Sequence, residues 1–227
     1  SYVAWQWSEG ATPGFDIVSY TGNATARTIS HSAGVAPEMI IVKNLADTDN
    51  WAVYHAGNTA APATDYLILN LANATADDAT VWNDTAPTSS VFSVGTSSLT
   101  NGNTEAMIAY VFAPVEGFSA FGSYVGNNST NGPMLNLGFR PAFIMIKASS
   151  TTGSWLLFDT ARDTYNAVYK LIYGQLNYVE DTTYTYLDIL SNGVKIKQVT
   201  GYAINDSGAT YVYMAFAENP FKTANAR

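Results

Sequence analysis

The sequence predicts an all-β protein built from two tandem antiparallel β-sandwich repeats, jelly-roll-like in character and each about 104 residues long. Three observations lead to this fold class: an internal duplication, a succession of short strand-like segments, and a surface with few charges. Of the 227 residues, 47% are hydrophobic and 12% are charged, against about 25% charged residues in ordinary globular domains. This composition supplies a sizeable core beneath an uncharged surface rich in Thr, Asn and Ser.

The duplication is seen when the chain is compared with itself at an offset of 104 residues. GVAPEMIIVK (34–43) then meets GFRPAFIMIK (138–147), and Trp51 in NWAVYHA meets Trp155 in SWLLFDT. A unit of this length matches one small sandwich domain, whereas solenoid repeats are shorter, at roughly 20–50 residues. We therefore predict two globular modules in tandem.

The module boundaries follow from a motif that occurs three times, as YVAWQW (2–7), MIAYVF and YVYMAF. Two modules account for only two of these three copies, if each copy is one strand. We expect residues 14–116 and 117–227 to form the two sandwiches. Residues 1–13 are then a boundary strand, either from a preceding module of a longer array or the first strand of the first module.

Strands are expected wherever short β-branched, aliphatic or aromatic runs lie between Gly, Asn, Pro or Ser. In chain order these runs are MIIV (39–42), WAVYH (51–55), YLILNL (66–71), VFSV (91–94), AFIMIK (142–147), WLLF (155–158), LDIL (187–190), VKIK (194–197) and TYVYMAFA (210–217).

Local signals refine this pattern. Asn192–Gly193 predicts a type I′ hairpin turn, and Pro37 and Pro141 are expected at strand entrances, where no backbone donor is required. Residues 164–177 contain apolar residues at a spacing that also suits a helix, and we favour strand there. SYTGN and SYVGN lack the Lys-Ser/Thr and the helix of a phosphate loop, and are expected to be β-turns.

Charge and cysteine content exclude several classes of function. The net charge is −8, and the ten basic residues are scattered singly, so we expect no nucleic-acid partner. No apolar run approaches the ~20 residues of a membrane span, so we expect no membrane insertion. There is no cysteine, which rules out disulfides and thiol catalysis.

Neither histidine indicates a catalytic or metal site. A site of that kind needs convergent partners, and across the duplication His55 aligns with Asp159, so no ligand set is repeated; His31 is likewise expected to be structural. Asp159 and Asp163 resemble a glycosidase carboxylate pair, but Arg162 lies between them, which favours a local salt bridge.

The remaining acidic residues are expected in loops. Glu180 and Asp181 are interpreted as loop charges, and the Asp- and Asn-containing stretches 46–50 and 76–84 lack the EF-hand spacing of calcium ligands. Turn formation explains these residues equally well. We expect no enzyme activity, no metal and no cofactor, and calcium should not be needed for folding or binding.

Aromatic residues are the best candidates for binding. Trp51 and Trp155 lie within apolar strands and are expected in the core. Six of the fifteen tyrosines fall in one stretch that the first module lacks: Tyr165, Tyr169, Tyr173, Tyr178, Tyr184 and Tyr186. A rigid ring with a hydroxyl suits recognition of other surfaces.

From this stretch we select Tyr165, Tyr178 and Tyr184 as candidate ligand-binding residues, together with Trp82. Tyr178 and Tyr184 flank the polar loop VEDTT and are expected near its tip. The alternative is that these tyrosines pack between modules or subunits.

The sequence resembles a family of bacteriophage structural proteins found in tail fibres of marine-type phages. The matching text covers nearly the whole chain: GFDIVSYTGNATARTISHSAGVAPEMIIVKN, NWAVYH, VWNDTAPTSSVFSVGTS, GFSAFGSYVGN, NGPMLNLGFRPAFIMIK, LDILSNGVKIK and YVYMAFAENPFKTANAR. The resemblance implies tandem β-sandwich modules in the distal part of a virion fibre, and it supplies no binding residues.

The expected function is therefore non-catalytic attachment of a phage tail fibre to a glycan or protein on the host-cell surface. One alternative is a purely structural virion component, such as a capsid decoration or tail spacer; another is a fibre-borne polysaccharide depolymerase. We expect location in the virion, with action outside the host cell. Low charge and fibre-like ancestry also predict contacts with other virion proteins and a homo-oligomer, with a trimer favoured.

Overall fold

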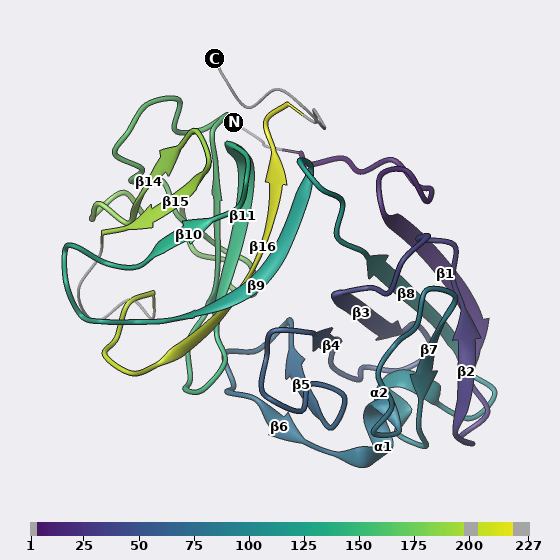
Figure 1. Cartoon of the computed structure of the whole chain (residues 1–227). Coiled ribbons are helices and arrows are strands. Elements are labelled where there is room, and N and C mark those ends of the chain that lie inside the picture. Colours follow the sequence, from purple (N-terminus) through teal and green to yellow (C-terminus); the bar gives the residue numbers. More distant parts are fainter. Residues whose placement is uncertain (1–3, 198–203, 220–227) are drawn as a thin grey trace. The chain divides into compact units, whose positions relative to one another are not determined.

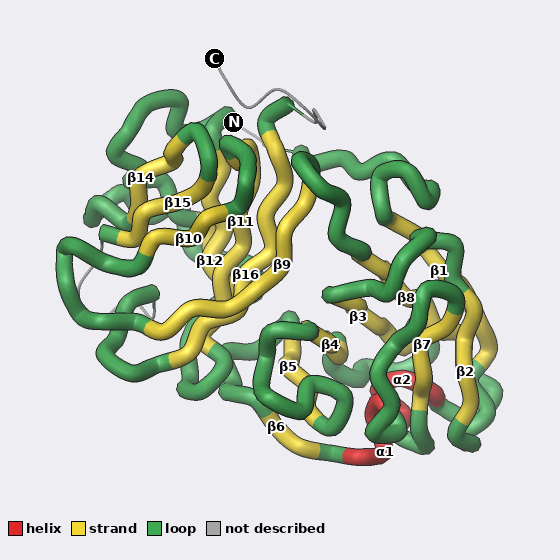
Figure 2. Tube along the Cα trace, in the orientation of Figure 1, coloured by secondary structure: helices red, strands yellow, loops and turns green. Residues whose placement is uncertain are grey.

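The chain folds into two compact units, described here from a computed structural model that covers residues 4–197 and 204–219 (Figure 1). The N-terminal unit comprises Gln6–Leu71 and Thr75–Val115. The C-terminal unit comprises the chain from Glu116 onward together with two short segments, Ser1–Trp5 and Ala72–Ala74. Most of the regular structure is strand, as Figure 2 shows, which confirms the predicted all-β fold class.

The N-terminal unit contains eight strands and two helices of four residues each. They are β1 (Phe15–Thr21), β2 (Arg27–Ser30), β3 (Met39–Asn44), β4 (Ala52–His55), β5 (Asp65–Ile68), β6 (Ala76–Asp77), α1 (Ala79–Trp82), β7 (Val91–Val94), α2 (Ser98–Asn101) and β8 (Ala106–Phe112). One antiparallel sheet has the order β1-β8-β3-β4-β5-β6, and β2 pairs with β7 in a second sheet.

The core of the N-terminal unit lies between these two sheets. Ile40 and Val42 of β3 join one buried cluster with Ile29 of β2 and Phe92 of β7. Alternate residues of a strand point to opposite faces of its sheet, so each sheet turns one apolar face inward. The result is a two-layer β-sandwich, and Trp82 of α1 belongs to the same buried cluster.

The C-terminal unit is also a two-layer sandwich. Its strands are β9 (Ser119–Val125), β10 (Met134–Asn136), β11 (Pro141–Ala148), β12 (Trp155–Asp159), β13 (Ile172–Tyr173), β14 (Leu187–Leu190), β15 (Gly193–Ile196) and β16 (Thr210–Ala217). They form two antiparallel sheets, β13-β12-β11-β16-β9 and β10-β15-β14. Ile144 and Ile146 from the first sheet share a buried cluster with Leu135 and Val194 from the second.

The two units use matching strand pairings. The order β1-β8-β3-β4 corresponds to β9-β16-β11-β12, and the register pairs Tyr20 with Met107 and Tyr124 with Tyr211, each pair offset from the other by 104 residues. The small sheets correspond too, since Ile29 pairs with Phe92 and Leu135 with Val194. The two units therefore share the order of four strands in their larger sheets.

The SYTGN and SYVGN motifs are not simple β-turns, contrary to the prediction. Each ends an edge strand and binds the segment before the last strand of its own unit, which in the N-terminal unit is the end of α2. The Tyr20 hydroxyl donates to the Thr100 carbonyl at 2.5 Å, and the Asn23 backbone N–H donates to Asn101 Oδ1 at 3.0 Å. A Cβ on Gly22 would lie 2.0 Å from the Gly102 carbonyl oxygen, so only glycine permits this approach.

The predicted strand over YVAWQW is wrong for the residues that the structure describes. Residues 4–9 form no strand, and the first three residues lie outside the described part of the chain. Instead, the Trp5 ring packs edge-on against Phe143 in the C-terminal unit, with 5.1 Å between centroids. Trp7 packs against Phe15 and Phe112 in the N-terminal unit.

The nine predicted strand segments all contain strands. Pro141 begins β11 and Pro37 precedes β3 by two residues. The predicted hairpin joins β14 to β15, but Leu190 pairs with Gly193, so its two-residue turn is Ser191–Asn192. Residues 164–177 are not helical; they contain the short β13 within largely irregular backbone.

Candidate ligand-binding surface

The stretch from Thr164 to Tyr186, called here the tyrosine segment, exposes large apolar and aromatic side chains. It connects β12 to β14 in the C-terminal unit and contains β13. Tyr165 is 85% exposed, Tyr178 66% and Val179 87%. The other exposed large side chains of the segment are Tyr169, Leu176 and Tyr184. Exposed rings on a fixed backbone are the kind of surface that binds other surfaces.

The four candidate residues therefore fall into different environments. Tyr165 and Tyr178 are largely exposed, and Tyr184 is 37% exposed because its ring packs edge-on against the buried Tyr186, 6.4 Å between centroids. Trp82 is only 2% exposed, in the core of the N-terminal unit with its ring edge-on to Tyr54. The structure thus corrects the selection of Trp82 as a surface residue.

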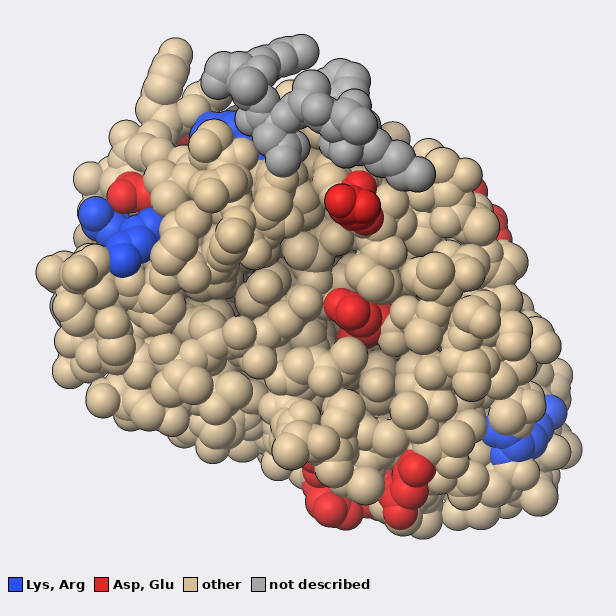
Figure 3. Space-filling view, viewed as in Figure 1, with Lys and Arg blue, Asp and Glu red and all other residues tan. Residues whose placement is uncertain are grey.

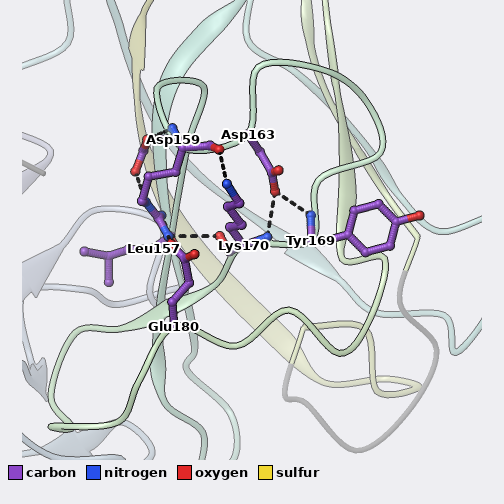
Figure 4. A network of polar contacts seen from close by, with 7 residues as sticks. Leu157, Asp159, Asp163, Tyr169, Lys170 and Glu180 are labelled. Atoms are coloured by element: carbon purple, nitrogen blue, oxygen red, sulfur yellow. Dashed lines mark hydrogen bonds and ion pairs between the residues drawn. The ribbon is translucent and has the colours of Figure 1, made fainter. Parts of the chain in front are cut away.

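Arg162 holds the start and the middle of the tyrosine segment together (Figure 4). Its Nε donates to Asp159 Oδ2 at 2.6 Å, and its Nη1 donates both to Glu180 Oε2 at 2.8 Å and to the Lys170 carbonyl at 3.2 Å. Nη2 donates to the Leu157 carbonyl at 3.1 Å. One guanidinium therefore contacts β12 and two parts of the tyrosine segment, called here its first arm (the stretch around Lys170) and its second arm (the stretch around Glu180).

A second set of contacts fixes the turn that follows Arg162. Asp163 Oδ2 accepts hydrogen bonds from the backbone N–H groups of Tyr169 at 2.7 Å and Lys170 at 2.6 Å. Lys170 Nζ donates to the Arg162 carbonyl at 2.7 Å. Figure 4 shows the Tyr169 ring directed away from this network. The polar atoms face inward and the ring remains available outside.

Two amide side chains anchor the segment further, and neither is identified by the sequence analysis. Asn166 exchanges hydrogen bonds with the backbone of Ile189, at 2.7 and 2.8 Å. Gln175 Oε1 accepts from the Trp155 backbone N–H at 3.0 Å. In the N-terminal unit Asn70 Oδ1 accepts from Trp51 N–H in the same way. In both units the contact joins a Trp to an amide side chain about twenty residues further along the chain, and this spacing is the sequence pattern that could have predicted it.

The polar loop VEDTT (179–183) is largely exposed, and two contacts at its centre hold its backbone in place. Glu180 turns back to Arg162, and the backbone of Asp181 pairs with Leu171 in an antiparallel bridge. Burial by itself would raise the pKa of Asp181, but hydrogen bonds from Thr183 and Tyr173 lower this pKa below its usual value. Asp181 therefore remains ionised and fixes the segment's second arm.

The tryptophans only partly match their predicted burial. Trp155 is buried in β12, as expected. Trp51 precedes β4, is half-buried, and stacks against Tyr110 with 6.4 Å between ring centroids.

The acidic and histidine residues form local structural contacts. Asp159 and Arg162 make the predicted ion pair. His55 Nδ1 accepts from the Gly57 N–H at 3.0 Å, while Asp159 at the matching position accepts from the Arg162 N–H. His31 Nδ1 accepts from Ala33 N–H at 3.3 Å.

The two Asp-containing loops that were considered for calcium also form local contacts. Asp47 Oδ1 accepts from Thr48 N–H, and Asp78 caps α1 by accepting from Thr80 N–H at 2.8 Å. Across residues 4–197 and 204–219, no three Asp, Glu or His side chains gather as a metal site would require.

Charged side chains are sparse in this protein, at 12% of its residues. The face seen in Figure 3 carries only scattered Lys, Arg, Asp and Glu side chains among other residues. Within the same described ranges, no helix has the length and apolar character needed to cross a membrane.

The fold and this surface define a protein of two β-sandwich units with an aromatic segment fixed by internal polar contacts. The chain belongs to the family described as Domain of unknown function (DUF7483), whose profile matches residues 1–220. The matched residues include parts of both units. Searches of curated proteins and of solved structures returned no significant match.

Proposed function

We propose that this chain is a non-catalytic attachment module of a bacteriophage tail fibre that binds a glycan or protein on the host-cell surface. The observation that carries the proposal is the exposure of Tyr165 and Tyr178 on a segment whose backbone is fixed at several points. Fixing a loop before binding reduces the entropy cost of association. The resemblance of the sequence to phage fibre proteins supports the virion setting.

The state of the carboxylates favours binding over catalysis. Asp159 and Glu180 are paired with Arg162, and Asp163 accepts two backbone hydrogen bonds. A glycosidase needs two carboxyl groups facing a substrate, one of them free to donate a proton. These side chains are instead committed to holding the tyrosine segment.

The proposal is tested by measuring adhesion of the purified, fluorescently labelled chain to a panel of marine bacterial isolates. We expect the parent to adhere to a subset of strains and the double variant Tyr165→Ala, Tyr178→Ala to lose that adhesion while keeping the parent's melting temperature. Val125→Ala removes an exposed side chain of β9 in the same unit and is the matched control.

The two alternative functions have their own outcomes in this experiment. Adhesion to no strain would favour a purely structural virion component. Shortening of a surface polysaccharide during incubation would favour a depolymerase. Adhesion of the double variant at the parent's level would show that recognition uses another surface.

Assembly is a second part of the proposal. A homotrimer fits a fibre component, and a weakly charged surface favours the apolar interfaces of stable oligomers. Light scattering at micromolar concentration is expected to give the mass of three chains, and a stable monomer of 24.4 kDa would contradict it.

A further inference from the structure

We infer that the tyrosine segment binds an uncharged, polyhydroxylated ligand, a neutral polysaccharide, and discriminates against anionic polymers. This inference rests on the proposed attachment function and names the ligand class. It follows from the aromatic groups that the segment exposes and from the charged groups that already take part in its internal contacts.

The exposed groups suit a sugar. Tyr165 and Tyr178 present ring faces, which stack on the apolar C–H face of a pyranose, and hydroxyl groups, which both donate and accept hydrogen bonds. The Tyr178 ring is itself supported, because it packs edge-on against Tyr173 with 5.8 Å between centroids. The Tyr173 hydroxyl donates to Asp181 Oδ2 at 3.2 Å, so the supporting ring is fixed in turn.

Both cations of residues 159–186 already bind groups of the protein. Arg162 has a side chain only 12% exposed and is bound by Asp159 and Glu180. Lys170 Nζ donates to the Arg162 carbonyl at 2.7 Å. A sulfated, phosphorylated or uronic-acid polymer is usually held by Arg or Lys, and within this stretch neither cation is turned outward to do so.

The net charge points the same way. Residues 159–186 contain four acidic residues and two basic ones, so their formal charge is −2. Anionic polymers are repelled by such a stretch. The carboxylates are also committed, since Asp163 accepts from two backbone N–H groups and Asp181 Oδ1 accepts from Thr183 N–H at 2.8 Å. An uncharged ligand is not repelled by this negative charge and needs no cation to hold it.

The arrangement of the two arms favours an extended polymer over a single sugar. Nη1 of Arg162 binds the carbonyl of Lys170 and the side chain of Glu180, which brings two backbone stretches to one group. Tyr169 precedes Lys170, while Tyr178 and Val179 precede Glu180. Exposed rings therefore come from both arms around a common anchor, and a chain of several sugars can contact more than one of them.

The test uses the full chain and immobilised polysaccharides: mannan and a neutral glucan as neutral probes, dextran sulfate and alginate as anionic ones. We expect binding to at least one neutral probe, with a Kd that changes less than about two-fold between about 50 and about 500 mM NaCl. The variant Tyr165→Ala, Tyr178→Ala should weaken this binding by about ten-fold or more, while Val125→Ala binds like the parent.

The outcomes separate this inference from the proposed function. Preferential binding of dextran sulfate or alginate, a steep loss of affinity with salt, or no binding to any neutral probe overturns the ligand class. If the double variant loses adhesion to cells while no neutral probe binds, attachment through the tyrosines stands and only the ligand class is wrong. If the double variant adheres like the parent, the proposed recognition surface is wrong as well.

Discussion

Asn205 makes in the C-terminal unit the same backbone contacts that Asn101 makes in the N-terminal unit. Asn101 Oδ1 accepts from the Asn23 N–H at 3.0 Å and its Nδ2 donates to the Thr25 carbonyl at 2.9 Å. Asn205 accepts from Asn127 N–H and donates to the Ser129 carbonyl, both at 2.9 Å. Each amide is fully buried and joins the end of an edge strand to the segment before a central strand.

Replacing either Asn with Ala should therefore destabilise the protein strongly. Each change removes the hydrogen bonds of a buried amide side chain, and we expect a loss of about 3 kcal/mol in the free energy of unfolding. Chemical denaturation monitored by tryptophan fluorescence measures it. The control is Asn103→Ala at an exposed position, which should cost less than about 0.5 kcal/mol. Equal effects of Asn101→Ala and Asn103→Ala would contradict the assigned role.

The glycines of the same motifs should be equally intolerant of substitution. A Cβ on Gly22 or Gly126 would lie 2.0 or 2.3 Å from a backbone carbonyl oxygen, so Ala forces the chain apart. We expect a loss of more than about 3 kcal/mol for either variant. Gly138→Ala is the contrast, because nothing lies within 4 Å of its Cβ and only its φ of +78° is unfavourable. That variant should cost about 1 kcal/mol, and the same cost for all three would refute the steric explanation.

Lys147 predicts how stability changes with pH. Its side chain is fully buried, and its ammonium donates to the carbonyls of Asn73 at 2.9 Å, Ala72 at 3.4 Å and Ala148. Burial nevertheless lowers the pKa of Lys147 from 10.5 to about 8. Between these values the unfolded chain binds the proton more tightly, so this residue makes stability rise with pH, by at most about 1.4 kcal/mol per unit.

The measurement is the free energy of unfolding between pH 7.5 and 9.5 for the parent and for Lys147→Met. The parent should gain stability relative to the variant as pH rises through 8. The range stops below pH 10 because burial raises the pKa of Tyr211 to about 12, and a raised tyrosine pKa causes stability to fall once the unfolded tyrosine ionises. Parallel profiles of the two proteins would show that Lys147 does not titrate in this range.

Arg162 should be far more important for stability than other paired arginines. Arg162→Met leaves Asp159, whose side chain is 2% exposed, without its cation, and we expect a loss of about 3 kcal/mol. Arg140 pairs with Glu218 at the surface, and Arg140→Met should cost less than about 1 kcal/mol.

Limited proteolysis provides the second readout for Arg162. Cleavage between residues 162 and 181 should be faster in Arg162→Met than in the parent, because the two arms of the tyrosine segment lose their common anchor. A variant with the parent's melting temperature and cleavage pattern would mean that Asn166 and Gln175 suffice to hold the segment.

Much of the strand pattern was predictable because it is a local property. Runs such as MIIV and AFIMIK combine β-branched or aromatic residues with flanking turn residues, and all nine such runs contain strands. The Asp159–Arg162 pair was predictable for the same reason, since its partners are three residues apart. Edge strands β1 and β9 are absent from those runs, because their half-exposed faces carry Ser, Thr and Gly among the apolar residues.

The all-β class, most of the strands and the concentration of tyrosines in one stretch follow from composition and short-range patterns, because these are local properties of the chain. The burial of Trp82, the ion pair between Glu180 and Arg162, and the contact of Asn101 with the motif around Gly22 became visible with the fold. Each of these depends on a partner 18 or more residues away. Packing of the whole unit determines which residues far apart in the sequence come into contact, and the local sequence does not specify these contacts.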